Sequence, residues 1–354
     1  MARLRLLAAL ACLLPLLALP ATAAPRWKPL RVHGQPVRAI ALTDLHQFSA
    51  LSLGDLARLQ ADGFNTVTVY AYRFMTNEHS VSLHVSPFTE PDELIAQTID
   101  RAHALGLAVQ LMPTVWVGDA GPLYWRGAIS PSDRNAFFDS YRAMVDHYAD
   151  LATAHRVEVL GIGSEMLSLE NEVSQWQHTA SSARQHYKGP LTYFAISQYA
   201  GAIRWWDQVD YPGISTYLSL SAAAQPSYAE LLKAWRTTHL PVLRKLAAKV
   251  GRPLQLAEVG FASSQNAAVH PEDGASGGVD ERLQADLYRA LLDGPVADPA
   301  FDGVSFWRWS AYETGPQNRG FSPKGKAAEC VLAQRWNPGG ASAVQCASYG
   351  RVLR

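Results

Sequence analysis

Two glutamates stand at the ends of two short apolar segments, and their positions suggest acid–base chemistry. Glu165 closes the segment VEVLGIGSE, and Glu258 lies in LQLAEVG. Each segment is typical of a buried parallel strand, because it is short, rich in leucine and β-branched residues, and flanked by helical patterns. The last residues of such strands lie at the carboxyl edge of the sheet, where barrel enzymes build their active sites. Two carboxylates facing one cleft provide what glycosidic bond cleavage requires, a proton donor and a nucleophile or base.

The spacing of the two glutamates fits the mouth of one barrel. The 93 positions between them hold three strand–helix units of about 31 residues each, a normal length for that motif. The fourth and seventh strands would then place the two carboxylates on opposite walls. Taken alone, G-x-G-S-E is a weak signal, because either glutamate could be a structural ion-pair partner. The pair on these two strands is a much stronger signal.

Strand and helix patterns alternate along the chain. We predict strands at residues 37–42, 66–70, 107–112, 157–162, 191–196, 211–216, 254–259 and 303–307. We predict helices at residues 91–105, 130–154, 172–187, 228–250 and 279–292. Alternating units imply a parallel sheet with right-handed crossovers, and eight strands in a chain of this length favour a closed (β/α)8 TIM barrel. No G-x-G-x-x-G follows the first strand, which weighs against a dinucleotide fold.

The two ends of the chain are predicted to lie outside the barrel. Residues 1–24 have a basic start, an apolar run and a cleavage site near Ala23 or Ala24, the pattern of a secretory signal peptide. A membrane helix is disfavoured, because the run is short and contains prolines. We therefore expect a secreted or periplasmic protein with a barrel at residues 25–329 and a tail at 330–354. Cys330 and Cys346 remain after processing, and an even pair in an exported protein favours a disulfide that fastens this tail.

Composition excludes several classes of partner. The sequence has 31 basic and 31 acidic residues, and no basic patch or polybasic run indicates nucleic acid or a membrane surface. It has no HExxH motif and no C-x-x-C pair, so we expect no metal and no cofactor. A serine hydrolase is disfavoured, because there is no G-x-S-x-G elbow. We expect a monomer whose partner is a polysaccharide or oligosaccharide.

Aromatic and polar residues near the other strand ends are candidates for contacts with a sugar. Trp307 and Trp309 end the eighth strand, where one of them could form the floor of a sugar subsite while the other packs in the barrel. Tyr217 follows the sixth strand and could donate a hydrogen bond to a carboxylate. Further candidates lie after the second strand, at Tyr72 and Arg73, and after the third strand, at Trp116, Trp125 and Arg126. A cation at Arg73 would lower the pKa of a nearby carboxylate, although such an arginine is more often a surface residue.

The sequence resembles glycoside hydrolase family 113 from about residue 62 to residue 329. The similar segments are LMPTVWV…WRGAISP, FFDSYRAMVDHYADLA, VLGIGSEMLSLE, YKGPLTYFA, WWDQVDYPGISTY, LAEVGFASSQNAA and FWRWSAYE…RGFSPKGKAAE. That family is a (β/α)8 barrel of a large retaining clan, with β-1,4-mannanase as its known activity. The resemblance gives Glu165 the acid/base place and Glu258 the nucleophile place. Trp309, or else Trp307, takes the place of the eighth-strand tryptophan, and Tyr217 that of the tyrosine beside the nucleophile.

The sequence departs from the family pattern at two places. Many clan members have asparagine directly before the acid/base, where it contacts the sugar 2-hydroxyl, and Ser164 stands there in this chain. Where the resemblance leads us to expect K-P-H-x-D after the third strand, residues 112–116 read MPTVW. Both places would touch substrate, so sugar preference need not follow the family.

The leading hypothesis is a secreted retaining hydrolase of a β-linked polysaccharide, with β-1,4-mannan or glucomannan as the first choice. We expect the two carboxyl groups roughly 5–5.5 Å apart, the spacing of retaining enzymes. Two alternatives stay open. One is a catalytically silent barrel that binds polysaccharide, and the other is a retaining β-glycosidase that acts on a different glycan.

Overall fold

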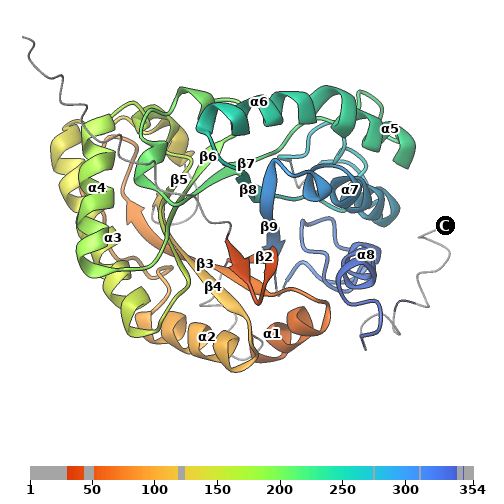
Figure 1. Cartoon of the computed structure of the whole chain (residues 1–354), viewed down its shortest axis with the longest axis horizontal. Coiled ribbons are helices and arrows are strands. Elements are labelled where there is room, and N and C mark those ends of the chain that lie inside the picture. Colours follow the sequence, from red (N-terminus) through yellow and green to blue (C-terminus); the bar gives the residue numbers. More distant parts are fainter. Residues whose placement is uncertain are drawn as a thin grey trace, which may run out of the picture.

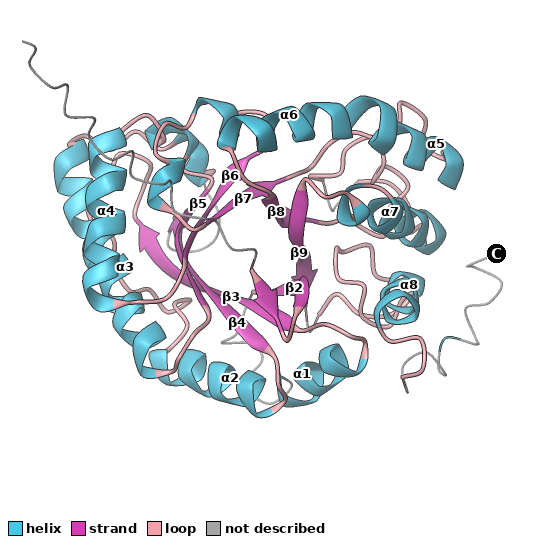
Figure 2. Cartoon of the chain, in the orientation of Figure 1, coloured by secondary structure: helices cyan, strands magenta, loops and turns pink. Residues whose placement is uncertain are grey.

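The computed structural model describes residues 30–43, 52–118, 124–273, 276–310, 312–340 and 346. Eight parallel strands, β2 to β9, form a closed barrel in which β2 pairs with β9 (Figures 1 and 2). The short β1 pairs antiparallel with β2. The strands are β1 Arg31–Val32, β2 Gln35–Leu42, β3 Thr66–Met75, β4 Ala108–Val117, β5 Val159–Ser164, β6 Leu191–Ile196, β7 Tyr211–Ser215, β8 Leu254–Val259 and β9 Phe301–Trp309. The predicted TIM barrel is confirmed.

Helices form a ring around the barrel (Figure 2). They are α1 Ser52–Ala61, α2 Asp92–Ala104, α3 Arg134–Ala154, α4 Val173–His186, α5 Tyr228–Ala234, α6 Leu240–Val250, α7 Glu281–Asp293 and α8 Ala327–Trp336. A π-helical turn, Trp235–His239, joins α5 to α6, so the helix predicted at 228–250 is interrupted. Helix α3 begins later than predicted, because the Asp133 side chain caps it by accepting hydrogen bonds from the amides of Asn135 and Ala136.

Two strands are longer than their sequence patterns predict. The ladder between β3 and β4 continues to the pair Met75–Val117, so β3 extends five residues beyond its predicted end at residue 70. Strand β9 continues to Trp309. In both cases pairing with a neighbouring strand extends the element beyond its apolar run, because the ladder bonds do not depend on side-chain type.

Helix α8, near the end of the described chain, packs against the barrel and helix α1. Arg58 of α1 forms an ion pair with Glu329 on α8, and Phe64 packs edge-on against Trp336, with ring centroids 5.0 Å apart. The boundary predicted at residue 330 lies inside this helix. Cys330 on α8 forms a disulfide with Cys346, with a Cα–Cα distance of 5.4 Å. The predicted signal peptide lies outside the described residues.

The interior of the barrel is layered. In one layer, Thr68 bonds to Gln110 and Ser305 at 3.1 and 2.9 Å, and Gln110 bonds to Gln255 at 3.0 Å. These four residues come from β3, β4, β8 and β9. Two positions further along β3, β4 and β8 lie Tyr70, Met112 and Ala257. These residues pack together with Phe194 of β6. Successive inward residues thus form stacked layers, as in other barrels of this kind, and the second layer supports the carboxyl edge of the sheet.

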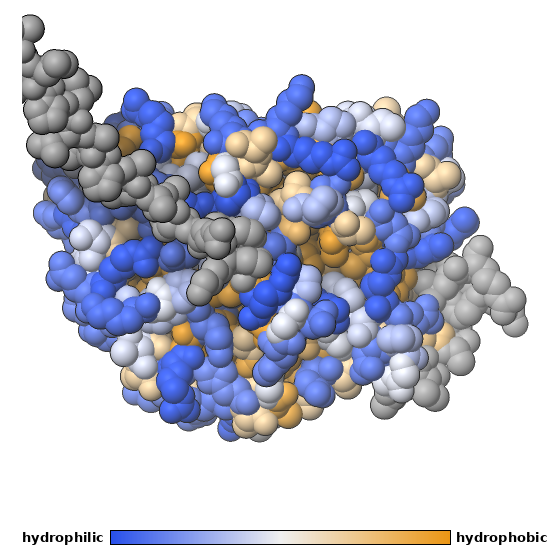
Figure 3. Space-filling model, in the orientation of Figure 1, coloured by the Kyte–Doolittle hydropathy of each residue, from blue (hydrophilic) through white to orange (hydrophobic). Residues whose placement is uncertain are grey.

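The larger hydrophobic core lies between the strands and the helices. Seen in the same direction, hydrophilic residues cover most of the outer ring, and hydrophobic residues show mainly nearer the middle (Figure 3). No helix in the described ranges is both long enough and apolar enough to cross a membrane.

Candidate active site

Glu165 and Glu258 lie in one cavity at the carboxyl end of the strands. Glu165 directly follows β5 and Glu258 lies near the end of β8. Both are buried, with 9% and 6% of their surfaces exposed. The cavity has a volume of about 570 Å³ and is lined by Trp125, Arg126, Glu165, Ile196, Gln198, Ser215, Tyr217, Glu258, Glu272, Trp307 and Phe321. The two strands therefore bring both glutamates to one cavity.

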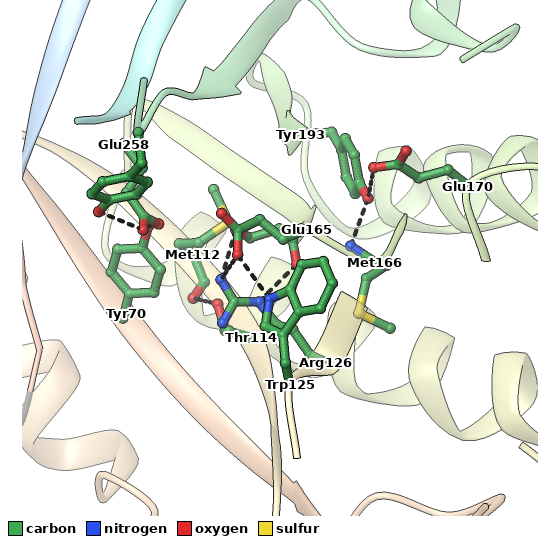
Figure 4. Close-up of polar contacts among 12 residues, drawn as sticks. Tyr70, Met112, Thr114, Trp125, Arg126, Glu165, Met166, Glu170, Tyr193 and Glu258 are labelled. Carbon is green, nitrogen blue, oxygen red and sulfur yellow. Dashed lines mark hydrogen bonds and ion pairs between the residues drawn. The ribbon is translucent and has the colours of Figure 1, made fainter. Parts of the chain in front are cut away.

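Two tyrosines hold the carboxyl group of Glu258. The Tyr217 hydroxyl donates to Oε1 at 2.9 Å. The Tyr70 hydroxyl donates to Oε2 at 3.2 Å, and Figure 4 shows Tyr70 beside Glu258. Tyr70 also packs edge-on against Trp307, with ring centroids 5.4 Å apart. Neutral donors on both oxygens stabilise the ionised form of a carboxyl group. Burial and the nearby Glu258 charge raise the pKa of both tyrosines well above 10, so both remain donors.

Glu165 is held by a cation and an indole on one oxygen. Arg126 donates from Nη2 to Oε2 at 3.0 Å, and Trp125 donates from Nε1 to the same oxygen at 3.4 Å. The guanidinium also donates to the carbonyl of Ser164 at 2.9 Å and to its hydroxyl at 3.3 Å. Among the described residues Glu165 Oε1 receives no bond. Ser164, expected to contact a sugar, therefore already has Arg126 as its partner.

The two carboxyl groups are electrostatically linked. Burial and the negative charge of Glu165 raise the pKa of Glu258 to about 7, while Arg126 and the bonds from Tyr217 and Tyr70 oppose that rise. The charges of Glu165 and Glu258 together raise the pKa of Arg126 despite its burial. Protons leave such a pair in two coupled steps. Near neutral pH the site can therefore hold one proton and one negative charge, the combination that acid-assisted nucleophilic attack requires.

The eighth strand supplies Trp307 to the cavity, and the expectation for Trp309 is corrected. Trp309 is 1% exposed and packs outside the barrel, under the cationic groups of Arg58 and Lys324. The register of β9 against β2 shifts after the pair Ile40–Phe306. One extra residue in β9 puts positions 307 and 309 on opposite faces, although simple alternation would place them on the same face.

Arg73 also lies away from the cavity. It hydrogen-bonds to Tyr148 on α3 and stacks over that ring with its guanidinium carbon 4.7 Å from the centroid. Asp92 is 3.9 Å from its guanidinium. Arg126, and not Arg73, therefore lowers the pKa of a carboxyl group in the cavity, that of Glu258.

Tyr72 and Trp116 lie one layer behind the cavity lining. Their rings meet edge-on at 5.2 Å, and Tyr72 stacks next to Tyr70 at 6.2 Å. They support Tyr70 and do not themselves line the cavity.

Several residues of the site were not predicted from the sequence. Tyr70 bonds to Glu258 from behind the cavity lining. It ends the predicted second strand, so its position could have been found from the same strand-end rule. Gln198 and Ser215 follow or end strands β6 and β7 but have no distinctive neighbours in the sequence. Glu272 and Phe321 lie in long loops after β8 and β9, and only the folded chain brings them to the cavity. In the described ranges, no group of three His, Cys, Asp or Glu residues could hold a metal ion.

Comparisons with known proteins agree with this geometry. An eight-stranded barrel with two glutamates at the ends of its fourth and seventh strands is an arrangement found in glycoside hydrolases. The sequence profile of Glycoside Hydrolase Family 113 matches residues 48–326. The chain belongs to this family and is a glycoside hydrolase. No curated protein sequence matches the chain.

Solved structures give the same fold. The GH113 β-mannanase AaManA from Alicyclobacillus acidocaldarius, in complex with ManMIm, is 28% identical, with a TM-score of 0.75 over 86% of this chain and 98% of that chain. A GH113 β-1,4-mannanase is 21% identical, with a TM-score of 0.75 over 85% and 99% of the two chains. A family 5 mannosidase from Rhizomucor miehei is 12% identical, with a TM-score of 0.60 over 85% and 92%.

Proposed function

We propose that this protein is a retaining endo-β-1,4-mannanase that acts on mannan or glucomannan. The observation that carries the proposal is the placement of Glu165 and Glu258 in one cavity of a family 113 barrel. The 28% identity to a protein described as a β-mannanase supports the choice of substrate. The departures at Ser164 and at residues 112–116 leave a different β-linked glycan as the second choice.

In the proposed mechanism Glu258 is the nucleophile. One of its oxygens attacks the anomeric carbon, and the bond from that carbon to the glycosidic oxygen breaks as Glu165 transfers its proton to this oxygen. Water then attacks the anomeric carbon of the glycosyl-enzyme, Glu165 accepts a proton from that water, and the bond to Glu258 breaks. Oε1 of Glu165 accepts no bond from any residue in the described ranges, which supports its role as the proton carrier. The two tyrosine bonds to Glu258 support an ionised nucleophile.

A double displacement sets a limit on the geometry of the pair. We expect about 5–5.5 Å between the two carboxyl groups in a complex with a sugar-shaped inhibitor. A crystal structure of that complex would measure it. A separation near 9 Å would instead indicate inversion of configuration, because it leaves room for a water molecule.

The function is tested by measuring reducing-end release from β-mannan, glucomannan, β-glucans and xylan. We expect the highest rate on mannan or glucomannan, with Glu258→Gln as the inactive control of matched size. A preference for a glucan or xylan would keep the enzyme class and change the substrate. No hydrolysis of any polymer, together with tight binding to one, would favour a catalytically silent binding protein.

We also propose that the protein is exported and that residues 1–24 are removed in the process. We propose that the mature protein is a monomer. The disulfide between Cys330 and Cys346 supports export, because such bonds persist in oxidising compartments. Mass spectrometry of the protein recovered outside the cytoplasm should find a new N-terminus at Ala24 or Pro25. An N-terminus at Met1 in that fraction would contradict the proposal, and gel filtration would test the monomer.

A further inference from the structure

The backbone at Glu165 adopts a conformation that a glutamate rarely takes. Its φ angle is +54°, in the left-handed region, which is unfavourable for a residue with a side chain. The neighbouring strand pairing is also irregular, because the register of β5 against β6 shifts between Gly161 and Ser164. Such a conformation persists only where the surroundings hold it.

Bonds from β6 hold both sides of this residue. The amide of Glu165 donates to the carbonyl of Phe194 at 2.7 Å. The next amide, that of Met166, donates to the hydroxyl of Tyr193 at 3.0 Å. The Tyr193 hydroxyl in turn donates to Oε1 of Glu170 at 2.9 Å (Figure 4). A continuous chain of hydrogen bonds therefore connects the backbone after Glu165 with a second, buried glutamate.

Glu170 is itself fixed by large aromatic residues. The indole of Trp205 donates to its carbonyl at 2.8 Å, and Trp176 donates to the carbonyl of Leu169 at 2.9 Å. The two indoles stack with centroids 4.8 Å apart, and the Tyr193 ring packs edge-on against both. Tyr193 is 0% exposed and Glu170 4% exposed, so leaving their polar groups without partners would be costly. Hydrogen bonds thus hold the turn after β5 at Glu165 and Met166 and again at Glu170.

We propose that Tyr193 and Glu170 are positioning residues that hold the left-handed backbone at Glu165 and thereby aim its carboxyl group at the reacting bond. This inference rests on the proposed function of Glu165 as acid/base. Neither residue lines the cavity, so their effect passes through the Met166 amide. Glu165 is needed most where the leaving group must be protonated, so a misaligned Glu165 should affect substrates unequally.

The test uses Tyr193→Phe, which removes the hydroxyl and keeps the ring between its tryptophans. For natural oligosaccharides we expect kcat/KM to fall about 10- to 100-fold. For an aryl glycoside with an activated leaving group we expect the glycosylation step to be spared and azide to increase turnover. Glu170→Gln keeps an acceptor for Tyr193 and should stay close to wild type. Equal losses on both substrate types, or no loss on either, would overturn the proposal.

A matched control separates positioning from lost stability. Tyr187 is also buried, and its hydroxyl donates to the carbonyl of Val157 at 2.8 Å, so Tyr187→Phe removes a similar bond without touching the turn. Hydrogen exchange supplies a readout that does not need activity. The Met166 amide should exchange faster in Tyr193→Phe than in Tyr187→Phe, and equal exchange would refute the positioning role. If the wild-type protein cleaved no polysaccharide, the proposed function would fail. The exchange result would still decide whether the hydrogen bonds through Tyr193 hold the backbone after Glu165.

Discussion

The two carboxyl groups of the cavity are held in different ways. Both oxygens of Glu258 accept bonds from neutral phenols, and Glu258 lies within strand β8. Among the described residues, only one oxygen of Glu165 accepts hydrogen bonds, from Arg126 and Trp125 together, and its backbone is left-handed. The first arrangement favours a fixed, ionised group. The second leaves one oxygen open while a nearby cation stabilises the charge that appears after proton transfer.

This difference indicates why one barrel edge can give two carboxyl groups different tasks. Neutral donors can hold a nucleophile without removing its negative charge from the attacking oxygen. A proton donor must alternate between two charge states, and its charged state gains most from a cation that is always present.

The largest effect is expected from removing either carboxyl group. Glu258→Ala should lower hydrolysis of every substrate by at least about 10⁴-fold, because no covalent intermediate can form. Glu165→Ala should be nearly as poor on natural polymers but should retain the first step on an activated aryl glycoside. Added azide should then restore turnover.

The stereochemistry of the azide product assigns the roles. Azide attacks the glycosyl-enzyme of the Glu165 variant and should give a β-glycosyl azide with retained configuration. In the Glu258 variant azide could only replace the nucleophile and would give the opposite anomer. NMR of the products distinguishes the two, and an exchange of these outcomes between the variants would show that the roles are reversed.

The next effect concerns the cation on the Glu165 side. Arg126→Met should lower kcat/KM about 100-fold, because Glu165 loses the donor that orients it. Arg126 also lowers the pKa of Glu258, so its removal should move the acidic limb of the kcat/KM profile to higher pH. Arg184→Met is the control, because that arginine pairs with Asp210 at 2.9 Å away from the cavity. The same loss in both variants would mean that the effect is one of folding.

A smaller effect is expected on the Glu258 side. Tyr217→Phe and Tyr70→Phe each remove one donor from the carboxylate, which should cost about 10-fold in kcat/KM, with the larger loss for the shorter Tyr217 bond. Both bonds lower the pKa of Glu258, so either variant should lose activity at a higher pH than wild type as the medium is acidified. Parallel pH–rate profiles of the three proteins measure this. An unchanged acidic limb would show that the tyrosines do not tune the nucleophile.

Much of the site could be predicted from the sequence, because strand ends mark it. Glu165, Glu258, Tyr217 and Trp125 follow or end strands and lie in the cavity. All eight barrel strands were found from their apolar, β-branched runs. Helices α1 and α8 were not predicted, and both pack against the barrel, where tertiary contacts stabilise short helices that have weak patterns.

The failures have structural causes that a linear pattern does not contain. Trp309 leaves the cavity because an irregular register in β9 reverses its face, and such a shift depends on the partner strand β2. Arg73 leaves it because β3 extends past the apolar run. The bonds from Tyr193 to Met166 and Glu170 join residues from β6 and from the turn after β5, and no spacing in the sequence indicates that they meet.

The smallest effect is one of stability, and it concerns the charge on Glu258. The folded protein raises the pKa of this group from 4.5 to about 7, so between these values the folded state binds more protons than the unfolded state. The free energy of unfolding of the wild type therefore decreases as the pH rises through this window, and the decrease is complete above about pH 7.

Glu258→Gln has no carboxyl group at this position, so its stability does not decrease for this reason. Relative to wild type, its free energy of unfolding should rise by on the order of 2–3 kcal/mol between pH 4 and pH 8. Urea unfolding at both pH values measures the difference, and Glu93→Gln, an exposed site on α2, should show none. A Glu258 variant that gains nothing at pH 8 would mean that the cavity accepts two negative charges without cost, and the electrostatic contrast between its two sides would then be wrong.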